Sequence, residues 1–334
     1  MKRLVTFGLV LLLGASVAFA AGGKEGAKAG ASSGGPGGYP SRPINFLVGY
    51  GAGGGMDISA RALQPALEKA LGGATINVVN KPGATSWIVY EEVARSKPDG
   101  YTISMVNLPG IYGYLDPKAK RTSNLSSFQL LGNLVTDYCI YICRKDETRF
   151  NTMKDLIEYA KKNEVTCSTA GTGSDDDFML KATVRDTGAN MTAVPGAGWS
   201  EILPALLGGH VDIACSNVGE ALASWKNGEV KALCVFSPQR STFMPDIPTW
   251  NESGFGTQIV MSSQRGVMMP AGGDPKIVQY LSAKIAEAMD TKEYKDKMIQ
   301  LGLLAEPLSA EQYTAEAKKQ ESFFAAMKDL IWGN

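Results

Sequence analysis

A glycine-rich loop is the first stretch of the sequence whose residue types could do chemistry. In NFLVGYGAGGGMDISARAL, residues 45–63, an apolar run meets four glycines in five positions, and a helical pattern then begins near Asp57. Backbone N–H groups that glycines leave open, beside a helix start, bind a carboxylate or another anion well. A tight strand-to-helix turn capped by Asp57 has the same pattern. The loop alone leaves both interpretations open; its candidate ligand-binding residues are Tyr50, Gly51, Ala52, Gly53, Gly54, Gly55 and Asp57.

Nucleotide binding is excluded by the spacing of these glycines. The dinucleotide pattern G-x-G-x-x-G would place its third glycine at Met56 or Ile58. The acidic residue expected after the next strand is also absent, because INVVN ends in Asn80. The chain has no Gly-Lys-Ser/Thr sequence, so the phosphate-binding loop pattern fails as well. We therefore expect no nucleotide cofactor, and no cofactor of any kind.

Catalysis and metal binding also find little support. The only histidine, His210, lies in the helix-to-strand turn LLGGHVD, where histidines are usually solvated. A serine triad needs a histidine base. Zinc sites draw several ligands from His and Cys at short spacing, which one histidine does not supply. We predict no catalytic residue and no metal ligand, so the chain is not expected to be an enzyme.

Two later loops repeat the strand, glycine loop and helix arrangement. They are STAGTGSDDDF, residues 168–178, and VPGAGWSE, residues 194–201. Three such loops could converge on one anion. We predict that Thr172 and Ser174 donate to a ligand carboxylate, and that the side chains of residues 175–177 point away from it, because ionised aspartates cannot donate. The candidates here are Ala170, Gly171, Thr172, Gly173, Ser174, Asp177, Pro195, Gly196, Ala197 and Gly198.

The elements that must position these loops alternate between strand and helix from Tyr39 onward. Such a βαβ series predicts an α/β fold with parallel sheets flanked by helices. The strands are too numerous for one small sheet, so we predict two lobes, with the C-terminal helices returning to the first. Ligands bind at the carboxyl ends of such strands, which makes the cleft between the lobes the expected site. Asn107 and Asn217, which end YTISMVN and VDIACSN, are further candidates.

The N-terminal residues have the pattern of an export signal followed by a linker. Lys2 and Arg3 precede an apolar run, and Ala18 and Ala20 form a small-x-small cleavage pattern. We predict that residues 1–20 are removed after Ala20; an uncleaved anchor is the alternative. Residues 21–38, AGGKEGAKAGASSGGPGG, are predicted to be a flexible linker. The remaining domains are predicted as lobe 1 from residues 39–142 and 259–334, and lobe 2 from residues 143–258.

Charge and cysteine content narrow the class further. The full chain has 33 basic and 33 acidic residues. Loss of Lys2 and Arg3 would leave 31 against 33, so nothing indicates nucleic-acid binding. Cys139 and Cys143 would lie about 13 Å apart on one strand, too far for a disulfide. We interpret the five cysteines as small buried residues, although longer-range pairs stay open.

The order of motifs resembles the substrate-binding proteins of tripartite tricarboxylate transporters, the Bug family. The resemblance begins at YPSRPINFLVGYGAGGGMDISAR and runs from Tyr39 to the C-terminus. It continues through VVNKPGA, KPDGYTI, STAGTGS, LLGGHVDIA, KALCVFSPQRSTFMPDIPTWNESGF and MMPAGGDP. It implies a two-lobed periplasmic-binding-protein (Venus flytrap) fold, each lobe a sheet flanked by helices. The implied carboxylate-binding loops are Tyr50 through Asp57 and Ala170 through Ser174.

The sequence departs from the family pattern at three places in the implied site. The usual V-P-Y-K-G is VPGAG here, so Gly196 and Ala197 stand for Tyr and Lys. Asp177 stands for a common histidine, and Gln264 and Arg265 for a common aromatic pair. A guanidinium at Arg265 could pair with a ligand carboxylate; a surface arginine or one paired with Asp175 to Asp177 is the alternative. We interpret the triple Asp, residues 175–177, as a helix start favoured by the helix macrodipole; the alternative is that it selects a ligand that carries an amine.

The resemblance implies a periplasmic, monomeric receptor. It would capture a small di- or tricarboxylate or a related organic acid and deliver it to a membrane permease with a large and a small subunit. One rival function is a ligand-presenting partner of a membrane signalling receptor, and another is an enzyme on the same scaffold. The sequence does not identify the acid.

Overall fold

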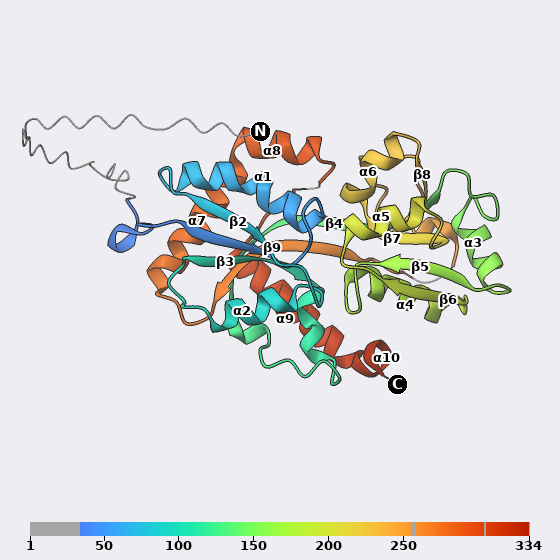
Figure 1. Cartoon of the computed structure of the whole chain (residues 1–334), viewed down its shortest axis with the longest axis horizontal. Helices are drawn as coiled ribbons and strands as arrows, with labels where there is room; N and C mark the ends of the chain where they lie inside the picture. The colour runs from blue at the N-terminus through green and yellow to red at the C-terminus, as the bar shows by residue number, and fades with distance from the viewer. Residues whose placement is uncertain (1–33, 256–257, 304, 334) are drawn as a thin grey trace, which may run out of the picture.

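The computed structural model describes residues 34–255, 258–303 and 305–333. The predicted signal and most of the predicted linker lie outside the described residues. Two α/β lobes sit side by side, joined by long strands that cross from one lobe to the other (Figure 1). The strands of the described residues form one sheet of ten strands, with β2-β1-β3-β9-β4-β7-β5-β6 as its path and β8 and β10 also paired to β4.

Lobe 1 is built on the parallel strands β1, β2 and β3. The glycine loop connects β1 to α1, and the C-terminal helices pack back onto this lobe, as predicted (Figure 1). Helix α1 begins after Gly54 because the extended backbone there ends the loop. The elements of this lobe are β1 (Ile44–Val48), α1 (Gly55–Ala70), β2 (Ile76–Asn80), α2 (Trp87–Arg95), β3 (Thr102–Leu108), β9 (Ser262–Pro270), α7 (Pro275–Asp290), α8 (Lys292–Gln300), β10 (Leu308–Ser309) and α9 (Ala310–Ala326).

Lobe 2 repeats the arrangement with β5, β6 and β7 as its parallel strands. Two capped helices show how the sequence sets their ends: Thr152 caps α3 and Ser174 caps α4, each through its side chain. The elements are α3 (Met153–Ala160), β5 (Val165–Thr169), α4 (Asp175–Thr187), β6 (Met191–Pro195), α5 (Trp199–Leu207), β7 (Ile213–Asn217), α6 (Val218–Lys226) and β8 (Val230–Val235). The last helix, α10 (Lys328–Trp332), reaches lobe 2 through Trp332, whose ring packs edge-on against Phe178.

One strand, β4 (Phe128–Arg144), belongs to both lobes. Up to Tyr138 it pairs with β9, and from Cys139 onward with β7 and β8. Its pairs are antiparallel, and so is β3 with β9, so the expectation of purely parallel sheets was wrong. The physical reason is that β4 runs from lobe 1 into lobe 2, whereas β9 runs back from lobe 2 into lobe 1. The two strands therefore pair in opposite directions. The change of partner falls just before the predicted boundary at residue 142; the boundaries themselves stay a prediction.

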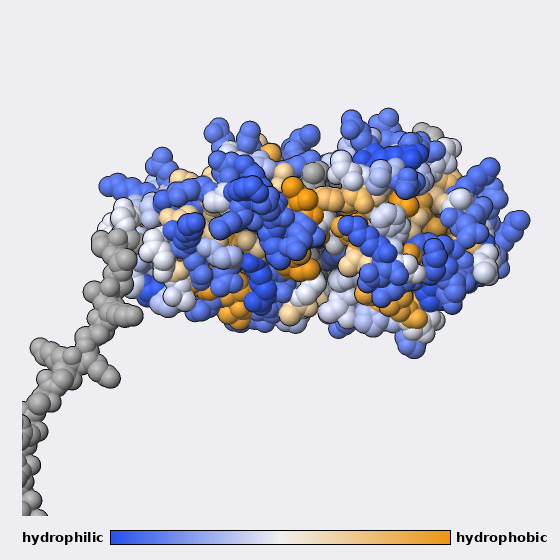
Figure 2. Space-filling view, turned by 90° about the horizontal axis from the view of Figure 1, so that it is seen from above, coloured by the Kyte–Doolittle hydropathy of each residue, from blue (hydrophilic) through white to orange (hydrophobic). Residues whose placement is uncertain are grey.

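Apolar side chains are packed inside each lobe, and the visible face is mostly hydrophilic, with small apolar patches (Figure 2). The five cysteines are free and buried, as interpreted from the sequence. No helix among the described residues combines the length and the apolar character that crossing a bilayer requires.

Candidate functional site

The two principal glycine loops have the same geometry, one in each lobe. Gly53 and Gly173 take the left-handed conformation, with φ of +81° and +80°. The N–H of each donates to the aspartate four residues later, Asp57 or Asp177, at 2.9 Å. Each aspartate also pairs with a cation one turn on, so the loops form an internal repeat. Asp57 and Asp177 therefore hold their own loops in shape.

This geometry leaves two N–H groups open in each loop. The N–H groups of Gly51 and Ala52 in lobe 1 have no partner among the residues that the structure describes. The same holds in lobe 2 for Gly171 and Thr172. Open backbone donors beside a helix start are suited to an anion. The third loop is partly satisfied, because the N–H of Ala197 already donates to Glu201 at 2.8 Å.

A small inner cavity of about 30 Å³ lies where the lobes meet. It offers space for little more than water. Loop residues from both lobes surround it, together with side chains from β3, β7 and β9. Its walls include Tyr50, Gly51, Gly54, Gly55, Asn107, Ala170, Gly198, Asn217 and Arg265 from the predicted set, and Asp175, Glu220 and Ser263 in addition.

Arg265 fills the floor of the inner cavity and is 1% exposed. Its Nη2 donates to Asn217 at 2.8 Å and its Nε donates to Ser263 at 3.1 Å. Its Nη1 lies 3.0 Å from Oδ2 of Asp137 as an ion pair without a well-aligned hydrogen bond. The guanidinium is therefore neutralised inside the protein by Asp137, neither a surface group nor a partner of residues 175–177.

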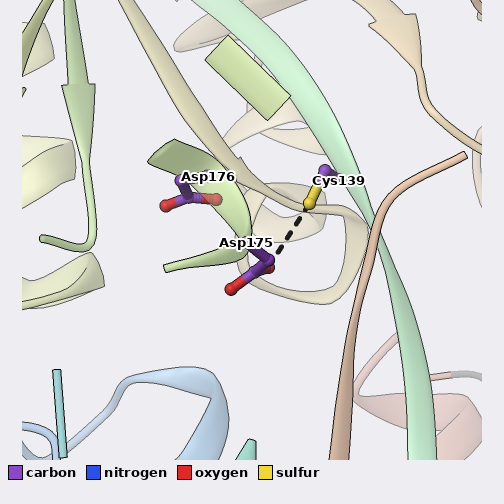
Figure 3. Close-up of side chains that lie close together, drawn as sticks. All are labelled: Cys139, Asp175 and Asp176. Carbon is purple, nitrogen blue, oxygen red and sulfur yellow. Dashed lines mark hydrogen bonds between the residues drawn. The ribbon is translucent and has the colours of Figure 1, made fainter. Parts of the chain in front are cut away.

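Asp175 points into the inner cavity at the junction of the lobes, and none of the three aspartates lines the larger outer cavity that opens beside it, so their orientation relative to a ligand stays a prediction. Its carboxylate accepts from Asn217 at 2.9 Å, from Asn107 at 3.3 Å and from the thiol of Cys139 at 3.3 Å. Figure 3 shows the thiol directed at Asp175 from β4, with Asp176 turned to another side. As the first residue of α4, Asp175 faces the opposite lobe, whereas Asp177 faces back toward its loop.

Burial disfavours the charged form of groups in this acidic cluster. It raises the pKa of Asp176 well above its usual range, and the neighbouring Asp175 charge raises it further. It also raises the pKa of the Cys139 thiol, again with help from Asp175. The possible ligand atoms of Cys139, Asp175 and Asp176 lie within 4.8 Å of one another. The protonated thiol donates to Asp175, whereas Asp176 accepts from the N–H of Ala170, so we interpret Cys139 and Asp175 as a hydrogen-bonded pair with Asp176 close by.

Stability is expected to rise as the pH falls toward 5. Burial raises the pKa of Asp137 from its ordinary 3.8 to about 6, although Arg265 opposes the shift. Between about pH 4 and pH 6 the folded state then binds more protons than the unfolded state, so lowering the pH stabilises it; Asp176 acts in the same direction. Denaturant unfolding of the wild type should give a larger free energy of unfolding at about pH 5 than at about pH 7.5, and Asp137→Asn should reduce that difference. An unchanged pH dependence in the variant would contradict this assignment.

Glu220 places a carboxylate of lobe 2 on the glycine loop of lobe 1. Its Oε1 accepts from the N–H of Gly55 at 2.8 Å, and its Oε2 accepts from Ser216 at 3.1 Å. The helix start of α1 thus already has an anion, supplied by the protein. With Asp137, Asp175 and Glu220 around one arginine, the inner cavity is poorly suited to a further negative charge.

Gly55 is required for the packing of Arg265. A Cβ at Gly55 would lie 2.3 Å from Cζ of Arg265, whereas one at Gly54 would meet only a carbonyl oxygen at 3.5 Å. We expect Gly55→Ala to lower the free energy of unfolding by about 1–3 kcal/mol through overpacking. Gly54→Ala is the matched control and should lose less, on the order of 1 kcal/mol at a helix cap. Equal losses of unfolding free energy in the two variants would show that the Arg265 side chain shifts to accept the added methyl group. The requirement for glycine at position 55 would then be wrong.

A larger outer cavity of about 440 Å³ opens beside the inner one. Lobe 2 contributes Ala170 to Gly173 and Pro195 to Ala197. Tyr50 and Ala170 line both the outer and the inner cavity. Lobe 1 contributes residues that were not predicted from the sequence. They are Gly83, Ala84, Thr85, Trp87, Gly110, Gly113, Asp116, Ala119 and Arg121, with Trp332 from the last helix.

The lobes touch across this cavity. Oγ1 of Thr85 donates to the carbonyl of Thr172 at 2.9 Å. The loop that carries Thr85 follows β2, so its position at a carboxyl strand end was the available signal. Five predicted residues line neither cavity, and their assignment as ligand contacts stays a prediction: four of them shape the loops, and Ala52 lies exposed. They are Ala52, Gly53, Asp57, Ser174 and Asp177.

The model of the tripartite tricarboxylate transporter family receptor matches residues 59–325. The chain belongs to this family. The family is one of receptors, and its match runs through both lobes, although it begins after the first glycine loop and ends before Trp332. BugT of Bordetella pertussis is 30% identical over 263 residues, which is 76% of this chain and 78% of that protein. The UPF0065 protein in the gbd 5'region of Cupriavidus necator is 31% identical over 288 residues, 85% and 86% of the two chains.

Solved structures confirm the two-lobed periplasmic-binding-protein fold. The periplasmic binding protein BugD is 30% identical, with a TM-score of 0.80 over 87% of this chain and 98% of that one. MatC of Rhodopseudomonas palustris, solved with bound malate, is 24% identical with a TM-score of 0.79, covering 88% and 100%. A second protein of that organism, solved with adipate, is 21% identical with a TM-score of 0.82, covering 88% and 98%. The last two establish likeness of fold alone.

Proposed function

We propose that this chain is a periplasmic solute-binding protein that captures a small carboxylate in the outer cavity and delivers it to a tripartite tricarboxylate transporter permease. The single observation that carries this is the pair of open N–H groups, on Gly171 and Thr172, in the wall of an interlobe cavity of about 440 Å³. A cavity of this size is in the range of small-molecule sites. No catalytic step is required of it.

The open hydrogen-bond donors favour the outer cavity over the inner one. In the inner cavity, Arg265 is already paired and Glu220 occupies the helix start of α1. In the outer cavity, the donors of the second glycine loop have no protein acceptor among the described residues. Family membership and the malate- and adipate-bound proteins of the same fold support an organic acid as the ligand.

Closure of the lobes would complete the site. The contact from Thr85 to Thr172 and the contact from Glu220 to Gly55 both join one lobe to the other. A ligand that touches both walls of the outer cavity would add to these contacts and favour the closed form, which a permease could then distinguish from the open form.

Calorimetric titration tests the capture step. Malate, succinate, adipate and citrate would be titrated into the purified wild type, with an uncharged sugar as the negative control. Saturable binding of at least one acid is expected, and binding of the sugar but of none of the acids would contradict the proposal. Cross-linking in membranes then separates delivery from signalling: adducts with the permease subunits support delivery, and adducts with a sensor kinase support the rival.

A further inference from the structure

Arg121 is a cation in the wall of the outer cavity, and no acidic residue in the described part of the chain forms an ion pair with it. The side chain is half-buried, and its Nε is buried without a hydrogen-bond partner. It forms no ion pair or hydrogen bond with any residue in the described part of the chain. A buried donor left unsatisfied destabilises a protein unless something else pairs with it. Arg121 thus differs from Arg265, whose three nitrogens all face protein groups.

Trp87 gives this guanidinium a rigid support. Cζ of Arg121 lies 5.2 Å from the centroid of the Trp87 ring, within range of a cation–π contact. The ring is 1% exposed, and its Nε1 donates to the carbonyl of Gly110 at 3.2 Å. A Cβ at Gly113 would lie only 2.6 Å from that nitrogen, so the ring is closely packed on this side as well. The indole nitrogen cannot accept a hydrogen bond, so the two terminal nitrogens of Arg121, which unlike Nε are not buried, stay open to a ligand.

The cavity therefore has anion-binding groups on both lobes. The open N–H groups of Gly171 and Thr172 come from lobe 2, and Arg121 comes from lobe 1. Two carboxylates also line the cavity, and each accepts a hydrogen bond from a nearby backbone N–H: Glu201 from Ala197 and Asp116 from Lys118. We propose that Arg121 binds the second acidic group of a dicarboxylate whose first carboxylate meets the glycine loop of lobe 2. This rests on the proposed function and names the residue that would set a preference for dicarboxylates over monocarboxylates.

A contact between Arg121 and a second carboxylate should be measurable as a difference in affinity between dicarboxylates and monocarboxylates. Hydrogen bonds between a guanidinium and a carboxylate are among the strong ones. Wild type should bind a dicarboxylate about tenfold or more tightly than the monocarboxylate of the same chain length. Arg121→Gln should remove that preference by weakening the dicarboxylate, while the monocarboxylate binds as before.

The experiment uses two matched pairs of acids, succinate with butyrate and adipate with hexanoate, titrated calorimetrically into three proteins. These are wild type, Arg121→Gln, and Arg95→Gln as a control with the same change in charge. Arg95 is on α2 and its side chain is 72% exposed, beside Glu91. Thermal unfolding confirms that each variant is folded.

The outcomes separate the two proposals. A dicarboxylate preference that disappears in Arg121→Gln and persists in Arg95→Gln supports the inference. Equal affinity of wild type and Arg121→Gln for the dicarboxylates overturns the inference and leaves carboxylate capture standing. A wild type that prefers the monocarboxylates overturns it too. If none of these four acids nor malate or citrate binds the wild type, the proposed function fails and the inference fails with it.

Discussion

Arg265→Met is expected to lower the free energy of unfolding by about 3–5 kcal/mol, the usual cost of removing one partner from a buried ion pair. The substitution would leave the carboxylate of Asp137 buried opposite an apolar side chain. It would also leave the side-chain oxygen Oδ1 of Asn217 and the hydroxyl of Ser263 without the hydrogen bonds that Arg265 donates to them. Denaturant unfolding monitored by circular dichroism measures the loss.

A double-mutant cycle identifies the cause of this loss. Adding Asp137→Asn to Arg265→Met removes the unpaired charge and should restore part of the stability. Arg121→Met is the matched control, because it removes an arginine without an ion partner among the described residues, and should change stability by less than about 1 kcal/mol. Similar losses for the two single arginine variants would mean that Arg265 contributes little beyond packing.

Thr172→Ala is expected to weaken carboxylate binding by about 1.5–3 kcal/mol, which is roughly tenfold to a hundredfold in affinity. Thr172 lines the outer cavity beside the open N–H groups, and its hydroxyl can donate to a charged oxygen. The interlobe contact with Thr85 uses the carbonyl of Thr172, so it survives the substitution.

Thr172→Ser is the matched control for that prediction. It keeps the hydroxyl and should bind within a few-fold of the wild type, as measured by titration of the tightest-binding acid in the panel. If the serine variant lost as much affinity as the alanine variant, the methyl group and not the hydroxyl would be responsible. If neither lost affinity, the ligand would not lie against Thr172, and the assignment of this wall would be wrong.

The glycine loops could be predicted because their signals are local. A strand, two to four glycines and a helix start lie within a dozen residues, and the left-handed conformation at Gly53 and Gly173 needs glycine. The common role of Asp57 and Asp177 was harder to see. Both sit four residues after that glycine, but only the folded loop turns each carboxylate back onto its N–H.

The junction between the lobes could not be predicted because its contacts are not local. Asp175 meets Asn107 across 68 positions, and Arg265 meets Asn217 across 48. A run of three aspartates at a helix start has an adequate local explanation in the helix dipole, so nothing in the sequence singled out Asp175. Arg121 likewise follows no motif; only its position above Trp87 in the outer cavity reveals it.

Native mass spectrometry of the protein purified from the periplasm tests the central claim most directly, since a closed two-lobed protein can retain its ligand. The spectrum should show a one-to-one adduct that is lost on denaturation and that fragments as a small organic acid. The adduct should be weakened in Thr172→Ala and kept in Thr172→Ser. An adduct that carries no acidic group, or an unliganded protein that takes up none of the acids when they are added, would contradict carboxylate capture.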